Sequence, residues 1–244
     1  FSEQERAALP NTDWYDVIFD DNVPMSNMHL SISDGGPRTD YSIGAGIFSQ
    51  DGLVGGELDK SNYERRNVRG TINTDLTEKL QLSVSADYTQ ITRNFLVENS
   101  GGTGTALMNY ITAIPSIYPA RAENGELFNM GRQSPNPEIN GVPLNVLGAV
   151  TNPLWSIDIT NNEAVQNVTL LSGVLSYQPV KNLNLRASYS FYDLSALNRS
   201  FTPFINYPEQ TFTTSGNVSY TEAPTDVENT QYNLTAEYTF DNIG

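Results

Sequence analysis

Cysteine is absent from the 244 residues, and histidine occurs once, as His29. The lack of cysteine excludes disulfide frameworks, thiolate metal sites and cysteine nucleophiles, and one histidine is too few for a histidine-based metal centre. Basic residues are also scarce. Lysine and arginine together number 13 and aspartate and glutamate 28, so the net charge is −15. Nucleic acid is therefore excluded as a partner, since phosphate binding requires cationic side chains. We expect no cofactor and no metal.

Long apolar runs are missing as well. No stretch approaches the roughly 18 apolar residues of a membrane-spanning helix. The chain begins with Phe1 rather than methionine, and residues 2–6 are polar where a signal peptide would be apolar. The sequence is therefore expected to be a processed product or a piece of a longer protein.

Hydrophobic and polar residues alternate with period two in three clear segments, 80–89, 183–191 and 231–240. A β-strand sends successive side chains to opposite faces, so each segment predicts a strand with one apolar and one polar side. Four further segments are shorter or less regular: 27–33, 41–47, 67–73 and 168–177, of which the last is interrupted by Leu170 and Leu171. The sequence thus predicts seven strands.

The connections between these strands alternate between short turns and long loops. We divide the chain into a lead-in segment 1–24, four strands in 25–93, a long loop 94–166, two strands in 167–198, a second long loop 199–229, and a strand and turn in 230–244. All the long loops then fall at one end of the strands. Short turns at one end and long loops at the other are typical of transmembrane β-barrels.

The predicted fold is all-β, an antiparallel arc of about seven strands from a larger transmembrane barrel. Aromatic residues sit near strand ends, where barrels place their aromatic girdles; these are Tyr88, Tyr189, Phe191, Tyr238 and Phe240. Seven is an odd number, and an open sheet would leave two unpaired edges in lipid, so an arc fits better than a closed barrel. The alternative is a secreted soluble β-sandwich that binds carbohydrate or mediates adhesion, whose strands alternate equally well.

Several segments along the chain carry a family resemblance. Residues 11–19 read NTDWYDVIF. They resemble the NTDW-x-D-x-IF segment of SusC/RagA-like TonB-dependent transporters of Bacteroidetes, and 27–36 are similar to the strand and turn that follow it. Residues 41–54 resemble the next strand and loop, 69–73 its R-x-x-x-N strand, and 152–154 (NPL) an element of its third loop. The chain departs from the family at Asp34, where glycine is usual, and in the more charged stretch 62–67.

The resemblance implies a 22-stranded outer-membrane barrel of a Gram-negative bacterium, filled by a plug, energised by TonB and capped by a SusD-like surface lipoprotein. Such transporters import glycans or peptides. The sequence contains no TonB box and no plug signature. The resemblance therefore covers only early barrel strands and extracellular loops of the family. It implies that these strands contact outer-membrane lipid. It implies no enzyme activity.

The long loop carries the candidate substrate-binding residues. Flat aromatic rings and guanidinium groups suit sugars and polar oligomers, and Tyr118, Arg121, Arg132 and Trp155 offer them. The alternative is that these side chains pack the loop on itself or hold a partner.

Four charged residues are expected to face the barrel interior by strand parity: Arg69, Asp87, Arg186 and Glu237. Buried charges need partners, so their expected role is pairing with the plug. The acidic pairs near residues 20 and 58 lack calcium-loop spacing, and no pair of carboxylates is spaced to suggest a glycan-cleaving enzyme.

Overall fold

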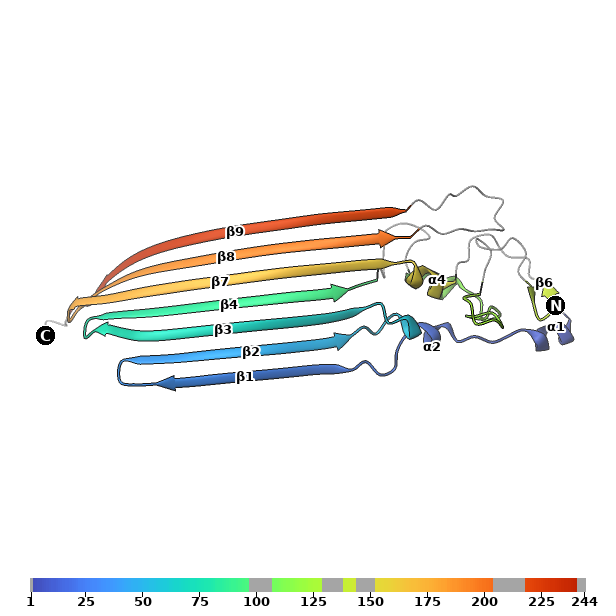
Figure 1. Ribbon diagram of the computed structural model, residues 1–244, viewed down its shortest axis with the longest axis horizontal. Helices are drawn as coiled ribbons and strands as arrows, with labels where there is room; N and C mark the ends of the chain where they lie inside the picture. The colour runs from blue at the N-terminus through green and yellow to red at the C-terminus, as the bar shows by residue number, and fades with distance from the viewer. Residues whose placement is uncertain (1, 97–106, 129–137, 144–151, 204–217, 241–244) are drawn as a thin grey trace.

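The computed structural model describes residues 2–96, 107–128, 138–143, 152–203 and 218–240, which form one long sheet with a smaller packed region at one end (Figure 1). The sheet has seven antiparallel strands in the order β1-β2-β3-β4-β7-β8-β9. They are β1 (Met25–Gly35), β2 (Thr39–Asp51), β3 (Asn62–Thr77), β4 (Leu80–Asn94), β7 (Asn161–Val180), β8 (Leu183–Thr202) and β9 (Ser219–Tyr238). Each strand pairs with its neighbour in the chain, so the sheet is a simple meander. The prediction of an all-β antiparallel arc of about seven strands is confirmed.

The last three strands are longer than the sequence predicted. β7 begins at Asn161 instead of 167, β8 continues to Thr202, and β9 begins at Ser219 instead of 230. The predicted loops 94–166 and 199–229 were therefore too long. Polar residues predominate in these additional segments, and the few hydrophobic ones, such as Val165, Phe201 and Val227, do not alternate regularly. Alternation of hydrophobic residues was the signal used, and it is absent there.

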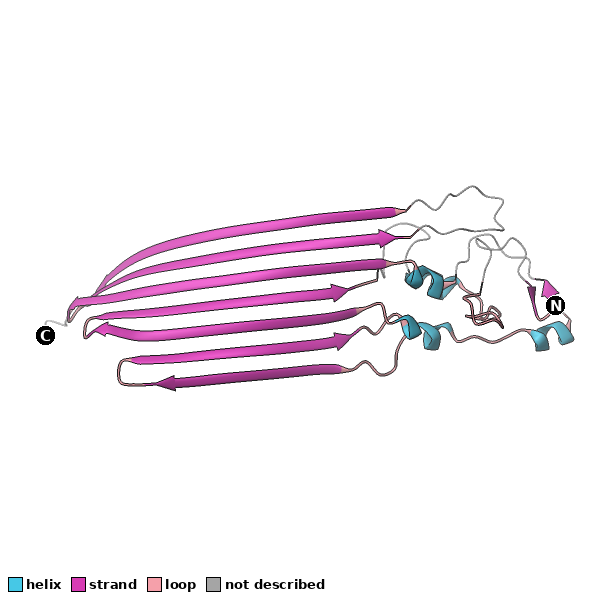
Figure 2. Ribbon diagram, in the orientation of Figure 1, coloured by secondary structure: helices cyan, strands magenta, loops and turns pink. Residues whose placement is uncertain are grey.

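The packed region lies at the long-loop end of the sheet, and we call it the loop cap. It consists of the described residues in 2–24, 52–61 and 95–160. Its elements are short: α1 (Glu3–Ala8), α2 (Trp14–Ile18), a 3-10 turn η1 (Gly56–Leu58), α3 (Leu107–Ala113), the hairpin of β5 (Glu138–Ile139) and β6 (Val142–Pro143), and α4 (Pro153–Asp158). Figure 2 shows these helices gathered at one end, while the three turns lie at the other. No helix in the described ranges is long and apolar enough to cross a membrane.

The hydrophobic core lies in the loop cap, not in the sheet. Its buried residues come from all three segments: Trp14, Ile18, Val54, Leu96, Leu107, Ile111, Ile114, Tyr118, Ile139, Val142, Leu154 and Ile157. The loops thus fold into one unit with a shared interior. No second layer of the described chain covers either face of the sheet.

Candidate functional site: a two-faced sheet beneath a loop cap

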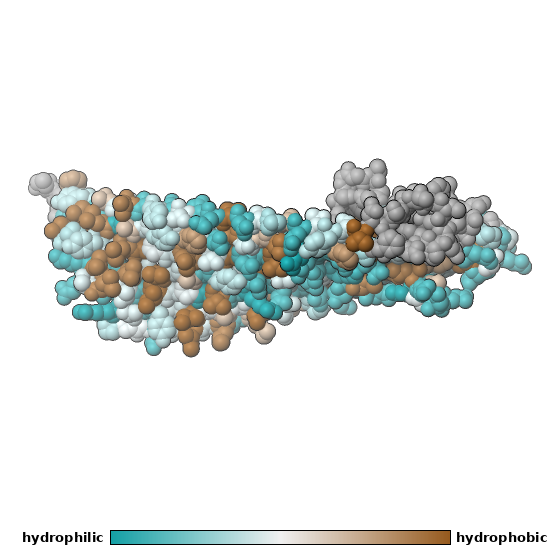
Figure 3. Space-filling view, turned by 45° about the horizontal axis from the view of Figure 1, so that its top comes forward, coloured by the Kyte–Doolittle hydropathy of each residue, from teal (hydrophilic) through white to brown (hydrophobic). Residues whose placement is uncertain are grey.

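One face of the sheet is apolar on every strand, because the register aligns the hydrophobic positions of neighbouring strands. One continuous row over six of the seven strands shows this alignment, and it reaches Thr230 on β9: Ile32, Ile43, Gly70, Ala86, Leu171 and Phe191. We call the hydrophobic stretches on this face the belt; they are 28–32, 41–47, 68–72, 80–88, 171–177, 183–191 and 232–240. Figure 3 looks obliquely onto the molecule and shows hydrophobic surface gathered over the turn half of the strands.

The belt residues are exposed. Val84 retains 38% of its accessible surface, Leu185 36% and Leu234 82%. In a soluble sandwich these three side chains would meet a second sheet, and here they do not. Such a large exposed apolar surface requires an apolar surrounding, because leaving it in water costs about 25 cal/mol for each Å².

The belt runs diagonally across the strands. The row of partners that begins at Leu30 on β1 passes through Ala45 and Val68 and ends at Glu228 on β9. On β9 the belt therefore lies closer to the turns than on β1. Strands of a membrane barrel tilt by about 35–45°, so a belt level with the membrane crosses successive strands at shifted positions.

Aromatic residues border the belt. The Tyr88 hydroxyl donates a hydrogen bond to Asn167 Oδ1, at 2.9 Å, at the edge nearer the loop cap. Near the turns, the rings of Tyr238 and Phe240 meet edge to face with their centroids 4.9 Å apart. An aromatic ring with a polar tip suits the boundary between lipid and water.

The opposite face is polar. One full row on it reads Ser33, Ser42, Thr71, Ser85, Ser172, Ser190 and Gln231. Within that row the Ser85 and Ser172 hydroxyls hydrogen-bond to each other at 2.8 Å. Hydroxyl groups in this arrangement suit a surface that faces water or polar protein groups.

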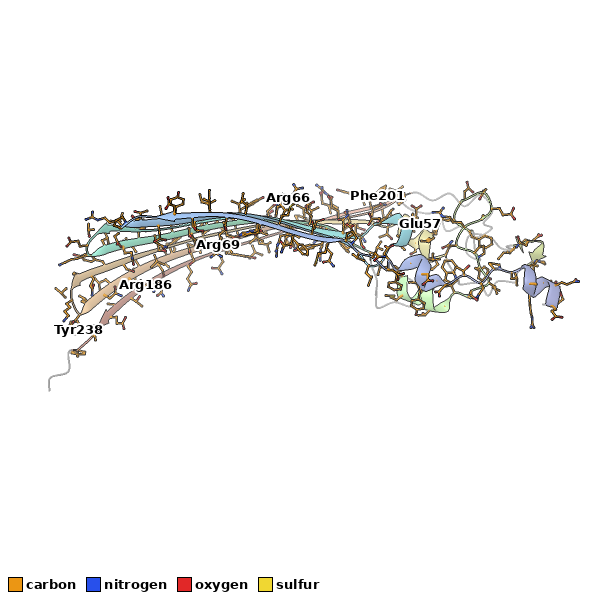
Figure 4. All side chains as sticks on the ribbon, turned by 90° about the horizontal axis from the view of Figure 1, so that it is seen from below. Glu57, Arg66, Arg69, Arg186, Phe201 and Tyr238 are labelled. Atoms are coloured by element: carbon orange, nitrogen blue, oxygen red, sulfur yellow. The ribbon has the colours of Figure 1, made fainter. Side chains whose placement is uncertain are left out.

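All four charged residues predicted for this polar face lie on it. Arg69 and Asp87 are direct partners on β3 and β4, whereas Arg186 and Glu237 lie nearer the turns on β8 and β9. Figure 4 shows Arg69 and Arg186 on the side of the sheet opposite to Arg66. Their pairing with a plug stays a prediction.

The loop cap owes its shape to a few polar contacts around the core. Asp13 caps α2 by accepting a hydrogen bond from the backbone N–H of Tyr15, at 3.0 Å. Asn152 is completely buried; it caps α4 through the Leu154 N–H and donates to the Ala120 and Phe128 carbonyl oxygens. These contacts explain the NTDW and NPL segments of the sequence: both begin a short helix and pin it to another part of the loop cap.

The predicted substrate-binding residues that the structure describes have different surroundings in the loop cap. Tyr118 is buried in the core with 4% exposure, which is the packing role given as the alternative. Arg121 forms an ion pair with Glu57, with Nη2 and Oε1 2.5 Å apart, and its Nη1 donates to the Gly125 carbonyl oxygen. Trp155 is partly buried on α4, and Arg132 lies outside the described residues. Contact of these four residues with substrate stays a prediction.

A cluster of arginine and aromatic side chains, which was not among the predicted site residues, lies on the polar face near the loop cap. The guanidinium of Arg65 lies over the Phe48 ring at 5.7 Å from its centroid, and that of Arg93 over the Phe95 ring at 5.1 Å. Tyr63 meets Phe48 edge to face, with ring centroids 5.8 Å apart. The parity of β3 and β4, continued beyond the belt, was the signal that could have found this cluster.

The described residues contain no group of three or more histidine, aspartate or glutamate side chains that could hold a metal ion. Two acidic residues of the loop cap form local contacts instead. Glu57 pairs with Arg121, and Asp158 lies 3.9 Å from the Lys60 ammonium, which also bonds to the Asp158 carbonyl oxygen.

An antiparallel meander with a diagonal apolar belt, a polar reverse face, short turns and long folded loops is the wall of a transmembrane β-barrel. The seven strands form an open arc of such a wall. Among solved structures, the chain is similar to three of the RagAB peptide importer: one of the transporter (TM-score 0.73), one of its closed-closed state (0.70) and one of its open-open state (0.71). Sequence identity is 19% in each, and 94–96% of this chain is covered.

The chain spans only 23–24% of the length of those importer chains. No protein-family model and no curated protein matches the sequence. At this low identity the likeness establishes the fold alone: an arc of barrel wall with long loops at one end.

Proposed function

We propose that this chain forms part of the wall and the extracellular loops of an active outer-membrane transporter of the SusC type, which imports glycans or oligopeptides with energy delivered by TonB. The observation that carries the proposal is the exposed diagonal belt, continuous over seven strands and joined to a folded loop cap. The likeness of fold to the RagAB peptide importer supports it.

The two faces then have different surroundings. The belt contacts the hydrocarbon of the outer membrane of a Gram-negative bacterium. The polar face lines the lumen, where Arg69, Asp87, Arg186 and Glu237 face the plug. The loop cap stands outside the cell, because the short turns of such barrels are periplasmic and the longer loops extracellular.

The loop cap is the proposed contact for a SusD-like surface lipoprotein that closes over the lumen. A loop region with its own core keeps a fixed shape, and a fixed surface binds a partner at a lower cost in conformational entropy. TonB would act through parts of the transporter that this chain does not contain. The role of the chain is to enclose and shape the path of the substrate, without catalysis.

The soluble β-sandwich is the weaker candidate. A sandwich requires the belt residues to pack against a second sheet. Leu185, Val84 and Leu234 remain exposed, and no described segment lies over them. Nothing in the described structure favours a carbohydrate-binding sandwich or an adhesion module.

The test is uptake by cells. Bacteria that carry the full-length protein are expected to take up fluorescent oligopeptides or oligosaccharides, and cells that lack its gene are expected not to. Uptake is lost when TonB is deleted or when a protonophore collapses the proton gradient, while the protein remains in the outer-membrane fraction. Recovery of the protein in the soluble fraction, or uptake that persists without TonB, contradicts the proposal.

A further inference from the structure

The strongest feature that the proposed function leaves unused is the cluster of Arg65, Arg93, Phe48, Tyr63 and Phe95. We propose that it is a subsite for carboxylate groups of the substrate, so that the transporter prefers acidic oligomers. This inference rests on the proposed function, because it places the cluster on the lumen side of the wall.

The position of the cluster follows from the register. Phe48 pairs with Arg65, and Tyr63 pairs with Arg93, so all four side chains project from the polar face. Arg65 is three residues from the belt on β3 and Arg93 is five residues from the belt on β4. Phe95 lies two residues after Arg93 and directly precedes Leu96, which belongs to the core of the loop cap. The cluster therefore lies at the extracellular rim of the lumen, where substrate would enter.

The two arginines are diagonal neighbours on adjacent strands, because Arg93 pairs with Tyr63 and Arg65 is two residues further along β3. Both are exposed, and neither forms an ion pair or a hydrogen bond with the described part of the chain. Two like charges at this spacing repel each other, and a carboxylate between them removes that repulsion.

The cluster is distinctive because the two rows of paired residues that contain Arg65 and Arg93 lack acidic side chains. The row through Arg65 reads Asn27, Phe48, Arg65, Ile91, Gln166, Ala196 and Thr225, and the row through Arg93 reads Met25, Gln50, Tyr63, Arg93, Ala164, Asn198 and Ala223. Neither row contains an acidic residue, although the chain as a whole carries a net charge of −15.

On the outer face at the same level, arginines are paired with carboxylates. Arg66 hydrogen-bonds to Glu64, and Arg199 lies between Glu163 and Glu222. The rim of the lumen is thus a local cationic patch, whereas on the outer face the arginines are balanced by neighbouring carboxylates. Figure 4 shows Arg66 on the side of the sheet opposite to the polar face marked by Arg69.

The aromatic rings give the cluster a binding geometry. A ring beneath a guanidinium fixes the plane of its N–H groups, so less freedom is lost when an anion binds. A planar guanidinium donates two parallel hydrogen bonds to a carboxylate. The carboxylate can come from an acidic side chain of a peptide or from a uronic acid of a glycan, and the two sources present the same group.

The experiment measures affinity of the purified full-length transporter in detergent for two matched pairs of probes. The peptide pair is Ala-Glu-Ala-Glu-Ala and Ala-Gln-Ala-Gln-Ala with blocked ends, and the glycan pair is trigalacturonate and its methyl ester. The quantity compared is the ratio of dissociation constants, neutral probe over acidic probe. The wild type is expected to give a ratio of at least about ten for one pair, as charge-assisted hydrogen bonds provide. The pair that shows the preference identifies the source of the carboxylate.

The double variant Arg65→Gln/Arg93→Gln is expected to reduce that ratio to about one, and Arg65→Lys/Arg93→Lys to retain part of it because the charge remains. The matched control is Arg66→Gln, which removes the adjacent arginine from the opposite face and is expected to keep the wild-type ratio. The preference should also weaken as salt concentration rises.

Three outcomes overturn the inference. One is equal binding of acidic and neutral probes by the wild type. Another is an equal loss of preference in the Arg66→Gln control. The third is a lower melting temperature of the double variant with its acid preference intact, which would mean that the arginines hold carboxylates of the transporter itself. Import of neutral oligomers without any acid preference would leave the proposed function standing, whereas a transporter that binds and imports no oligomer of either charge contradicts both.

Discussion

The indole Nε1 of Trp14 donates a hydrogen bond to the carbonyl oxygen of Pro115, 3.3 Å away and 101 residues later in the chain. The backbone N–H of Thr12 donates to the Ser116 carbonyl oxygen in the same region, at 2.8 Å. The lead-in segment before β1 and the long loop after β4 are thereby joined at the centre of a shared core. The ends of the strands next to the loop cap are consequently held together by these segments as well as by the sheet.

Replacing Trp14 with alanine is expected to open the loop cap without unfolding the barrel wall. Trp14 is 4% exposed, and removing a buried tryptophan side chain costs about 3–5 kcal/mol. The measurement is the rate at which an added protease cuts the loops of the full-length protein on intact cells. The control is Tyr15→Ala, because Tyr15 is the next residue and is 56% exposed. Equal cleavage of both variants would contradict a shared core.

A charged residue in the belt is expected to impair membrane assembly. Leu185→Arg directs a cation into the hydrocarbon and should cost about 2–4 kcal/mol if the position is near the membrane centre. The matched control is Asn184→Arg, which introduces the same side chain one residue away on the polar face, opposite Glu237. The amount of heat-resistant folded barrel in outer membranes compares the two variants. A loss that is the same for both would mean that the assignment of faces is wrong.

The sequence predicted the faces of most strands, because a strand with one apolar face alternates with a period of two. Val84, Leu185 and Leu234 all lie on the side that alternation assigned to them. The strand ends beyond the belt could not be predicted in this way. Residues 161–166 and 219–229 are paired in strands, yet polar residues lie on both of their sides.

The core of the loop cap could not be predicted from local sequence patterns, for a different reason. This core brings Trp14 together with Ile157 and Val54, which come from three separate segments. No periodicity links such positions, so the sequence offered the packing of Tyr118 only as an alternative and did not indicate the pairing of Arg121 with Glu57. Arg65 and Arg93 lie on the face that the alternation of their strands predicts. That neither is paired with a carboxylate became evident only from the pairing of residues between strands.

Gly56→Ala is expected to displace the loop that connects β2 and β3. A Cβ at this position would lie 2.2 Å from the Val17 carbonyl oxygen, and the backbone φ is +51°. The control is Gly125→Ala, where φ is +84° but no atom lies within 4 Å of the added carbon. Both variants carry the cost of a left-handed residue, about 1–2 kcal/mol, so the difference between them isolates the steric clash. Hydrogen exchange of residues 52–61 should be faster in Gly56→Ala only, and similar exchange in both variants would rule out a tight approach.

The ion pair between Arg121 and Glu57 allows a test of the predicted substrate role of Arg121. Both side chains are exposed, so the pair should stabilise the loop cap by at most about 1 kcal/mol. If Arg121 is only a structural residue, Arg121→Ala weakens substrate affinity no further in a Glu57→Ala background. If Arg121 contacts substrate, its removal weakens affinity equally in both backgrounds. The measurement is a double-mutant cycle on the affinity of the full-length transporter for its preferred oligomer.

Alkaline pH is expected to loosen the loop cap through Tyr118, because burial raises the pKa of this phenol above its usual value. The unfolded cap releases the Tyr118 proton at about pH 10, whereas the folded cap retains it to a higher pH. Above about pH 10 the unfolded state therefore binds fewer protons than the folded state, and the free energy of unfolding falls as pH rises. Tyr118→Phe removes this contribution, so its loop cap should resist protease at alkaline pH better than that of the wild type, relative to neutral pH. Tyr15→Phe serves as the control because Tyr15 is exposed, and the prediction is wrong if Tyr118→Phe and Tyr15→Phe respond to pH in the same way.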